Sequence, residues 1–165
     1  MTFPDSLVCQ RMDSPLGPIL LAASAQGLAG AWFTEGQRDT PDHAAWTEAP
    51  GHPVLQRAAA QLADYFDGRR QDFDLPLDLT HGTAFQQAVW QALLAIPFGT
   101  STSYGELARR IGRPKAVRAL GAAVGRNPVS IIVPCHRVLG ADGSLTGYAG
   151  GLDRKTSLLR TEGLL

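Results

Sequence analysis

The chain has 165 residues, a hydrophobic content of 44% and 15 acidic against 15 basic residues. This length and composition suit one globular domain or two small ones, and they exclude a fibrous or disordered chain. No apolar run of the roughly 18 residues that a membrane helix needs is present. Residues 1–6 lack the charged and apolar regions of a secretion signal. We therefore expect a soluble, cytoplasmic protein with no membrane partner.

The net charge of zero hides a division of charge along the chain. Residues 1–79 carry 5 Lys+Arg against 11 Asp+Glu, whereas residues 80–165 carry 10 Lys+Arg against 4 Asp+Glu. The halves have formal charges of −6 and +6, and a polyanionic partner would prefer the second. The alternative is that the basic half balances an acidic neighbour across an interface.

The first half predicts a small antiparallel sheet and one helix. Strand-like apolar runs at residues 7–12, 19–23 and 28–33 are separated by Pro/Gly-rich turn signals. Apolar positions from Val54 to Phe66 then keep helical spacing as far as Gly68. Residues 72–81 read as a linker. Because no chemical motif occurs in residues 1–79, we expect an N-terminal α/β scaffold domain there.

The second half predicts mainly helices. Thr83 with Gln86, and Ser103 with Glu106, are capping-box signatures that begin two helices, which end before Pro97 and at Gly112. Pro114 suits the first turn of a third helix that includes residues 115–122. The last two make a helix-turn-helix candidate, although ordinary bundle packing remains an alternative. The expected fold class is α+β, with a C-terminal, mainly helical domain at residues 80–165.

The stretch from Ile131 to Val138 carries the most chemistry. Residues 131–133 read as a short buried strand that ends at Pro134 and delivers Cys135 to a loop or turn. Cys135 is followed by His136 and Arg137, and cationic neighbours lower the pKa of a thiol toward the reactive thiolate. A structural cysteine beside an incidental histidine is the alternative, since free cysteine is usually buried. Cys9, the other cysteine, is expected in the core.

The sequence Pro-Cys-His-Arg-Val at 134–138 resembles the active-site motif of the O6-alkylguanine-DNA alkyltransferases, the suicide DNA-repair proteins. The similarity covers the chain from about residue 80 to its end, in the order of the family. It includes Gly82 to Gln87, Val89-Trp90, Ile96 to Gly99, Ser103 to Gly105, Pro114 to Ala119, Asn127-Pro128, Gly147 to Gly151 and Leu158-Leu159.

This resemblance implies a function and a set of site residues. The alkyl group of an O6-alkylguanine in double-stranded DNA would pass once and irreversibly to Cys135, after the nucleotide is flipped out through the minor groove. The expected catalytic residues are Cys135, His136, Glu162, Tyr104 and Asn127. The expected DNA-binding residues are Arg118, which would fill the gap left by the base, with Ala116, Arg113, Tyr104 and Arg137. The expected substrate pocket contains Val138, Tyr148, Ala149, Ser130 and Thr146.

Within this reading, Glu162 accepts from His136, which acts on Cys135 through a water, and Tyr104 donates to the purine. Ala149 stands where some relatives have serine, so only a backbone donor is expected there. The chain would act as a monomer without a cofactor, and the acceptance of O4-alkylthymine stays open.

Three alternatives belong to other classes. A cysteine hydrolase would use the same thiol but turn over many times. A non-catalytic DNA-binding module would not need Cys135. A structural zinc site is not expected, because Cys9 and the histidines at 43, 52 and 81 lack metal-ligand spacing.

Overall fold

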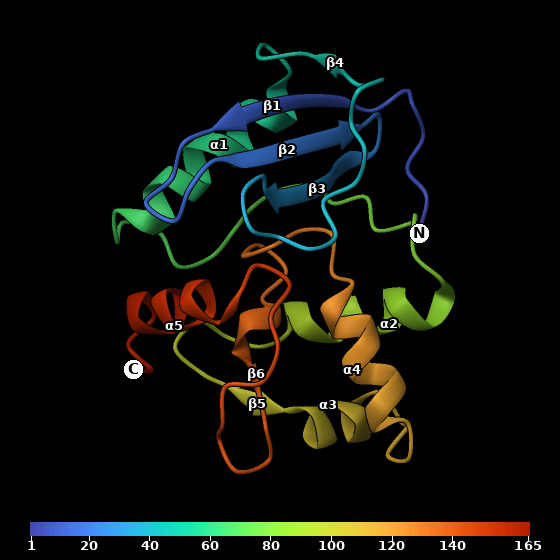
Figure 1. Cartoon of the computed structure of the whole chain (residues 1–165), viewed down its shortest axis with the longest axis vertical. Helices are drawn as coiled ribbons and strands as arrows, with labels where there is room; N and C mark the ends of the chain where they lie inside the picture. Colours follow the sequence, from blue (N-terminus) through green and yellow to red (C-terminus); the bar gives the residue numbers. More distant parts are fainter.

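The structure, a computed structural model that describes residues 1–165, contains two layers of different character (Figure 1). A sheet with one long helix forms the N-terminal half. Four α-helices, one short 3-10 helix and two short strands form the C-terminal half below it. The predicted α+β class is therefore confirmed. None of the helices has the length and apolar character needed to cross a membrane.

Three strands of the sheet follow the predicted antiparallel meander. They are β1 (Val8–Met12), β2 (Ile19–Ser24) and β3 (Gly27–Phe33), paired in that order. A two-residue strand, β4 (Thr47–Glu48), adds to β1 in parallel and gives the sheet order β3-β2-β1-β4. The sequence did not predict β4, because two exposed residues are too few to show an alternating pattern.

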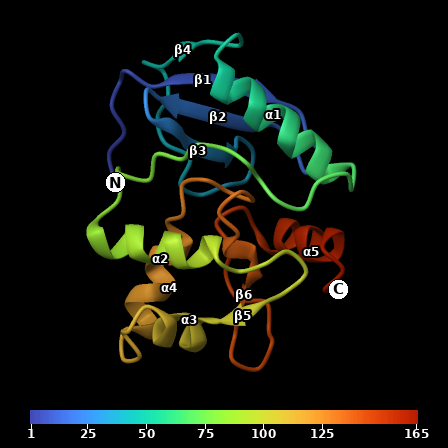
Figure 2. The same ribbon diagram turned by 180° about the vertical axis from the view of Figure 1, so that it is seen from behind.

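Helix α1 (Pro53–Phe66) lies across one face of this sheet, as Figure 2 shows from behind. Its buried side chains, Leu55, Ala58, Leu62 and Tyr65 among them, recur at helical spacing, which confirms the predicted helix. The opposite face is covered by a smaller cluster that contains Cys9 and Trp46. Cys9 is a buried core residue, as expected.

The predicted helices of the second half are α2 (Ala84–Leu94), α3 (Tyr104–Arg110) and α4 (Val117–Gly125). The capping box at Thr83 is complete, since Thr83 accepts from the Gln86 backbone and Gln86 accepts in return. At α3 only half of the predicted box forms. Ser103 accepts from the Glu106 backbone, but the Glu106 carboxylate turns to Arg109 and Arg110 instead.

The start of α4 differs from the prediction. Pro114 does not lie in the first turn of the helix, because Arg113 to Ala116 form a separate turn closed by a hydrogen bond from Ala116 N to Arg113 O (2.9 Å). Proline suits the second position of such a turn, since its φ is already set. Ala116 is therefore the N-cap residue of α4, and it has no side-chain cap.

The predicted strand at residues 131–133 is wrong. Ile131 has a φ of 72°, the only non-glycine residue in the chain with a positive φ, and the chain turns there. Asn127 explains the turn: its side-chain amide donates to Val133 O (2.7 Å), while its side-chain oxygen accepts from Val129 N (3.0 Å). The apolar run is still buried, but as a turn whose backbone groups bond partly to one another and partly to the Asn127 side chain.

The turn leads directly into η1 (Cys135–Arg137), a single turn of 3-10 helix, and then into β6 (Val138–Leu139). Strand β6 pairs in parallel with β5 (Thr102–Ser103), which immediately precedes α3. Helix α5 (Leu152–Thr161) follows a long loop and packs against η1. This arrangement places η1 beside α5. Through the pairing of β5 with β6 it also places η1 near the start of α3, which packs against α4.

The two halves share one hydrophobic core. Ala31 of β3 donates to Pro128 O (2.8 Å) and accepts from Ser130 N (3.0 Å), so the sheet edge is bonded to the turn before η1. The larger core cluster contains residues of β2, β3, α1, α2 and α4 together. The chain segment that carries Cys135 is thus held from both halves.

Candidate active site

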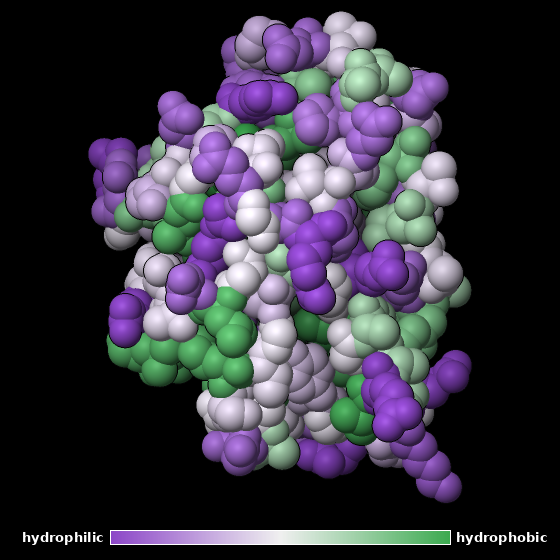
Figure 3. Space-filling model, viewed as in Figure 1, coloured by the Kyte–Doolittle hydropathy of each residue, from purple (hydrophilic) through white to green (hydrophobic).

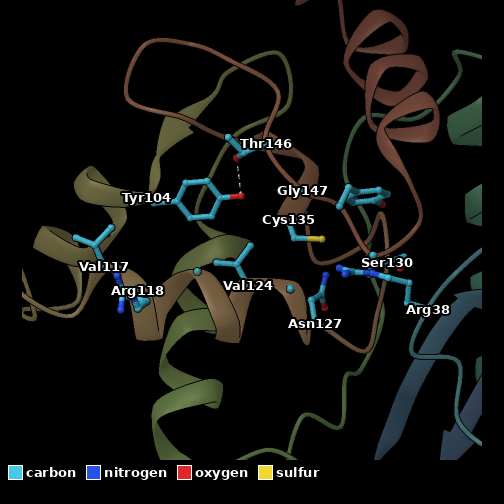
Figure 4. A pocket seen from close by; sticks show the side chains of 14 residues that line it. Arg38, Tyr104, Val117, Arg118, Val124, Asn127, Ser130, Cys135, Thr146 and Gly147 are labelled. Atoms are coloured by element: carbon cyan, nitrogen blue, oxygen red, sulfur yellow. Dashed lines mark hydrogen bonds between the residues drawn. The ribbon is translucent and has the colours of Figure 1, made fainter.

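Cys135 lies at the wall of a cavity of about 420 Å³ between α3, α4 and the loop before α5. Figure 4 shows its sulfur pointing into this space, with Tyr104 and Thr146 on one side and Asn127 on the other. Eight residues expected in the site line the cavity: Tyr104, Arg118, Asn127, Ser130, Cys135, Thr146, Tyr148 and Ala149. Such a volume lies within the range of small-ligand pockets, about 300–1,000 Å³.

Burial governs the thiol. It raises the pKa of Cys135 to about 11, and a hydrogen bond from Asn127 and the charge of Lys155 oppose this rise without cancelling it. The sequence-based expectation of a thiol whose pKa is lowered by its neighbours is therefore wrong for the unbound protein. At neutral pH the thiol is protonated, and a base must remove its proton before it can attack.

His136 is the base that the geometry offers. Its Nε2 lies 2.7 Å from Glu162 Oε2, and both side chains are fully buried. Burial lowers the pKa of His136, so the ring is neutral near pH 7. Because an ionised carboxylate can only accept, Nε2 must carry the hydrogen, which leaves Nδ1 as the basic nitrogen. Nδ1 is buried and has no hydrogen-bond partner in the protein.

Glu162, the C-cap residue of α5, is fully engaged as an acceptor. Tyr65 Oη donates to its Oε2 (2.7 Å), and Arg137 donates to Oε1 through Nε (2.7 Å) and to Oε2 through Nη2 (3.0 Å). Burial alone would raise the pKa of Glu162, but the bonds from His136, Arg137 and Tyr65 outweigh it and lower the pKa to about 2. The expected pairing of Glu162 with His136 is present.

The structure places two of the predicted residues elsewhere. Arg137 is 6% exposed, and its guanidinium binds Glu162 and Ile96 O (2.6 Å), so it faces the interior rather than a DNA surface. Val138 is fully buried in β6 and does not line the cavity. In both cases η1 directs the chain inward. This corrects the expected role of Arg137 in DNA binding and the expected place of Val138 in the pocket.

The predicted DNA-binding residues that remain are on the surface. Arg113 and Arg118 are exposed, and Ala116 is partly exposed between them. Arg118 lies at the far end of the cavity from Cys135 (Figure 4) and forms no ion pair. Tyr104 connects this end to the cavity, and Thr146 donates to its hydroxyl oxygen at 3.2 Å.

Sequence reasoning missed three residues of the site. Lys155 is completely buried, and its ammonium group donates to Val138 O (2.7 Å) and Thr146 O (2.9 Å), which ties β6 to the loop over the cavity. Burial lowers its pKa to about 8. Its position was detectable: Lys155, Leu158 and Glu162 recur on one helix face. Tyr65 and Arg38, from the N-terminal half, gave no comparable signal.

The fold and the site together define a class: a protein that pairs a helix-turn-helix with a buried cysteine, histidine and glutamate. Comparison with known proteins agrees with this class. Residues 84–164 match the family described as 6-O-methylguanine DNA methyltransferase, DNA binding domain. Residues 7–79 match its ribonuclease-like domain. The chain therefore belongs to the 6-O-methylguanine DNA methyltransferase family.

Similar proteins cover almost the whole chain. The methylated-DNA–protein-cysteine methyltransferase of Mycobacterium leprae (strain TN) is 49% identical over 154 residues, which are 93% of this chain and 91% of the relative. The crystal structure of the Mycobacterium tuberculosis O6-methylguanine methyltransferase has a TM-score of 0.86 at 49% identity, covering 94% of this chain and 92% of that one. A structure of M. tuberculosis OGT in complex with DNA has a TM-score of 0.85 at 49% identity, covering 93% and 91%.

Proposed function

We propose that this protein repairs DNA by moving the alkyl group of an O6-alkylguanine to the sulfur of Cys135, once per molecule. The observation that carries the proposal is the position of Cys135: its sulfur faces the cavity, and the next residue is a buried histidine held by Glu162. The family to which the chain belongs, and the relative bound to DNA, support DNA as the partner.

DNA would approach the face formed by α3, α4 and the turn between them. In the view of Figure 3, hydrophilic side chains project from the lower end of the molecule over these elements. Helix α4 exposes small residues, Ala119 and Ala122, and it contains no Asn or Gln to read base edges. A small-faced helix next to exposed cations suits the minor groove and recognition by shape.

The alkylated base must leave the helical stack, because its O6 atom is not accessible within a duplex. The cavity beside Cys135 is the space that would receive it. Arg118 stands at the rim of that space with no acidic partner, so its side chain is free to occupy the position that the base leaves.

Transfer then requires a thiolate. His136 takes the Cys135 proton at Nδ1, directly or through one water, and the resulting imidazolium is stabilised by Glu162. The sulfur attacks the alkyl carbon, the carbon–O6 bond breaks, and its electron pair moves to the guanine. Tyr104 is placed to protonate the purine, because Thr146 donates to its oxygen and leaves the phenol hydrogen free.

A backbone donor for the guanine oxygen is also present. The amide groups of Tyr148 and Ala149 border the cavity and donate to no group in the protein. The alanine at position 149 therefore leaves the backbone donor in place. Asn127 has a supporting role, since it holds the turn that presents Cys135.

The product is a thioether on Cys135, and neither His136 nor Tyr104 provides chemistry that would cleave it. One turnover per molecule follows. The free thiols of Cys9 and Cys135 fit a reducing compartment, which supports a cytoplasmic protein as part of the proposal. One monomer contains all the residues used in these steps.

An intact-mass measurement tests the proposal. After incubation with excess duplex that contains O6-methylguanine, the protein should gain one methyl group, located on the peptide that contains Cys135. Cys135→Ser should stay unmodified, whereas Cys9→Ser should react like the wild type. Multiple turnovers would indicate a hydrolase instead, and a methyl group on Cys9 would contradict the assignment of the nucleophile.

A further inference from the structure

Tyr65 is the one residue of the N-terminal half that bonds directly to the Glu162 and His136 pair. It lies on α1, is 1% exposed, and its hydroxyl is 2.7 Å from Glu162 Oε2, across 97 positions of sequence. The rings of Phe66, Phe73 and Phe98 surround it at centroid distances of 5.5, 5.6 and 6.4 Å. The phenol is thus held in one orientation, with its hydroxyl directed at the carboxylate.

The bond to Tyr65 uses the same carboxylate oxygen that holds His136. Oε2 accepts from Tyr65, His136 and Arg137, whereas Oε1 accepts from Arg137 alone. Burial and the negative charge of Glu162 raise the pKa of Tyr65, so the phenol stays protonated and always donates. A permanent donor on Oε2 fixes the plane of the carboxylate, and it reduces the negative charge available to His136.

We propose that Tyr65 is a positioning residue of alkyl transfer: its hydroxyl orients Glu162 and, through Glu162, keeps His136 neutral with its Nδ1 free to accept the Cys135 proton. The sheet and α1 are then part of the catalytic relay as well as a scaffold. This inference rests on the proposed function, because it assigns Tyr65 a part in the same reaction.

Other charged or titratable groups act on His136 and would be unchanged by a substitution at Tyr65. They are Arg137, which comes from η1, and Lys155, which comes from α5. Arg137 and Lys155 lower the pKa of His136, and Glu162 raises it. Removal of the Tyr65 hydroxyl leaves Glu162 a stronger acceptor for the histidine, so the pKa of His136 should rise.

The test is Tyr65→Phe, which removes only the hydroxyl. In a saturated complex with methylated duplex, we expect the rate constant of transfer at neutral pH to fall about tenfold, as for loss of a hydrogen bond to a charged group. The acid limb of the pH–rate profile should move to higher pH, since neutral His136 is the active form. The Kd for DNA should not change, because Tyr65 is remote from the DNA-facing surface.

Phe73→Leu is the matched control. It weakens the packing around the Tyr65 ring but leaves the hydroxyl and Glu162 in place. This variant should lower the Tm without moving the acid limb. If both variants moved the acid limb equally, packing would be the cause and the proposal would be overturned.

A second substitution keeps the test decisive if Tyr65→Phe does not fold. A fluorinated tyrosine placed at position 65 keeps the ring and makes the hydroxyl a stronger donor, so the acid limb should move to lower pH. If the variants at position 65 kept the wild-type rate constant and the wild-type acid limb, with Cys135 still methylated once, the hydroxyl would serve only the fold. Failure of the proposed function looks different, because wild-type Cys135 would then not be methylated at all.

Discussion

Burial determines which of the groups around Cys135 are ionised. The thiol sits where its own ionisation is unfavourable, with a pKa raised to about 11. A protonated thiol is protected from oxidation and adventitious alkylation, which suits the proposed single-turnover reaction. Reactivity then depends on His136, whose neutral state follows from the same burial. The Glu162 carboxylate, with its pKa lowered to about 2, stays ionised to hold that histidine throughout the neutral range.

The raised pKa of Cys135 predicts that high pH restores the activity of a variant without His136. His136→Gln should slow transfer at pH 7 by about 10²–10⁴, the usual contribution of a general base. The deficit should shrink as the pH rises toward 11, because Cys135 then ionises without a base. Quenched-flow assays of methyl transfer between about pH 6 and 10.5 measure both effects. A deficit that is constant over this range would mean that His136 supports the fold and does not accept the proton.

The exposed and the buried charged groups of the C-terminal half lie on different elements. Helices α3 and α4 and their turn expose cations, while the buried charged groups of η1 and α5 are all hydrogen-bonded. Tyr104 from α3, Arg118 from α4 and Cys135 from η1 all line the cavity. Substitutions on α4 should therefore affect DNA handling without altering the thiol.

The turn between α3 and α4 predicts salt-dependent binding. Arg113→Gln and Lys115→Gln should each weaken binding to any duplex and reduce the slope of log K against log salt concentration by about 0.9, the value for one lost phosphate contact. Fluorescence anisotropy with an unmodified duplex at several salt concentrations measures this. Arg11→Gln, an exposed cation on the sheet, is the control and should leave the slope unchanged. Salt-independent binding would refute the proposed DNA face.

Helix α4 also predicts a difference between two substrates. Arg118→Ala should slow the repair of a lesion inside a duplex, where unstacking costs a few kcal/mol, but it should affect the reaction with free O6-benzylguanine much less. Methyl and benzyl transfer are followed by the mass of the protein. An equal loss of rate on both substrates would show that Arg118 supports the fold or the thiolate, and not base extrusion.

At the scale of the whole molecule, the two halves are joined at the active site. Hydrogen bonds cross between them, among them the backbone bonds of Ala31, the Tyr65 to Glu162 bond, and the bond from Arg154 Nε to Leu16 O at 3.0 Å. The guanidinium of Arg154 also lies 4.3 Å from the centre of the Phe33 ring. The division of the chain into two domains between residues 79 and 80 stays a prediction. The contacts show that the two parts are bonded directly to each other.

These contacts predict one cooperative unfolding transition. The calorimetric and van't Hoff enthalpies of thermal unfolding should agree, because the core runs through both halves without a break. Differential scanning calorimetry of the full chain measures this. Two resolved transitions would instead support a pair of independently stable domains.

Stability should also depend on Glu162 as the pH falls. A carboxylate whose pKa drops from 4.5 to about 2 on folding contributes about 3 kcal/mol above pH 4.5, and this is lost as the pH falls through 4.5 to 2. Glu162→Gln should therefore be less stable than the wild type at pH 7, and the difference should disappear near pH 2. Urea unfolding at several pH values measures it. Glu48→Gln, at an exposed position, should show little difference at any pH.

The sequence by itself determined the longer strands and helices and the identity of the reactive segment. The strand-like apolar runs, the helical spacing in α1 and the complete cap at Thr83 are local signals, and local signals survive folding. The segment from Pro134 to Val138 was sufficient to single out Cys135 and His136. The charge difference between the halves pointed to the half that is proposed to bind DNA.

Only the tertiary structure decided how these residues act. The geometry at Ile131 depends on the Asn127 side chain, and the inward direction of Arg137 depends on Glu162, a residue 25 positions away. The pKa of Cys135 depends on burial by elements that are distant in sequence. Tyr65 looked like an ordinary core position of an amphipathic helix. Its proposed role depends on the bond to Glu162 at the end of α5, because hydrogen bonding and desolvation depend on distance in space and not on separation along the chain.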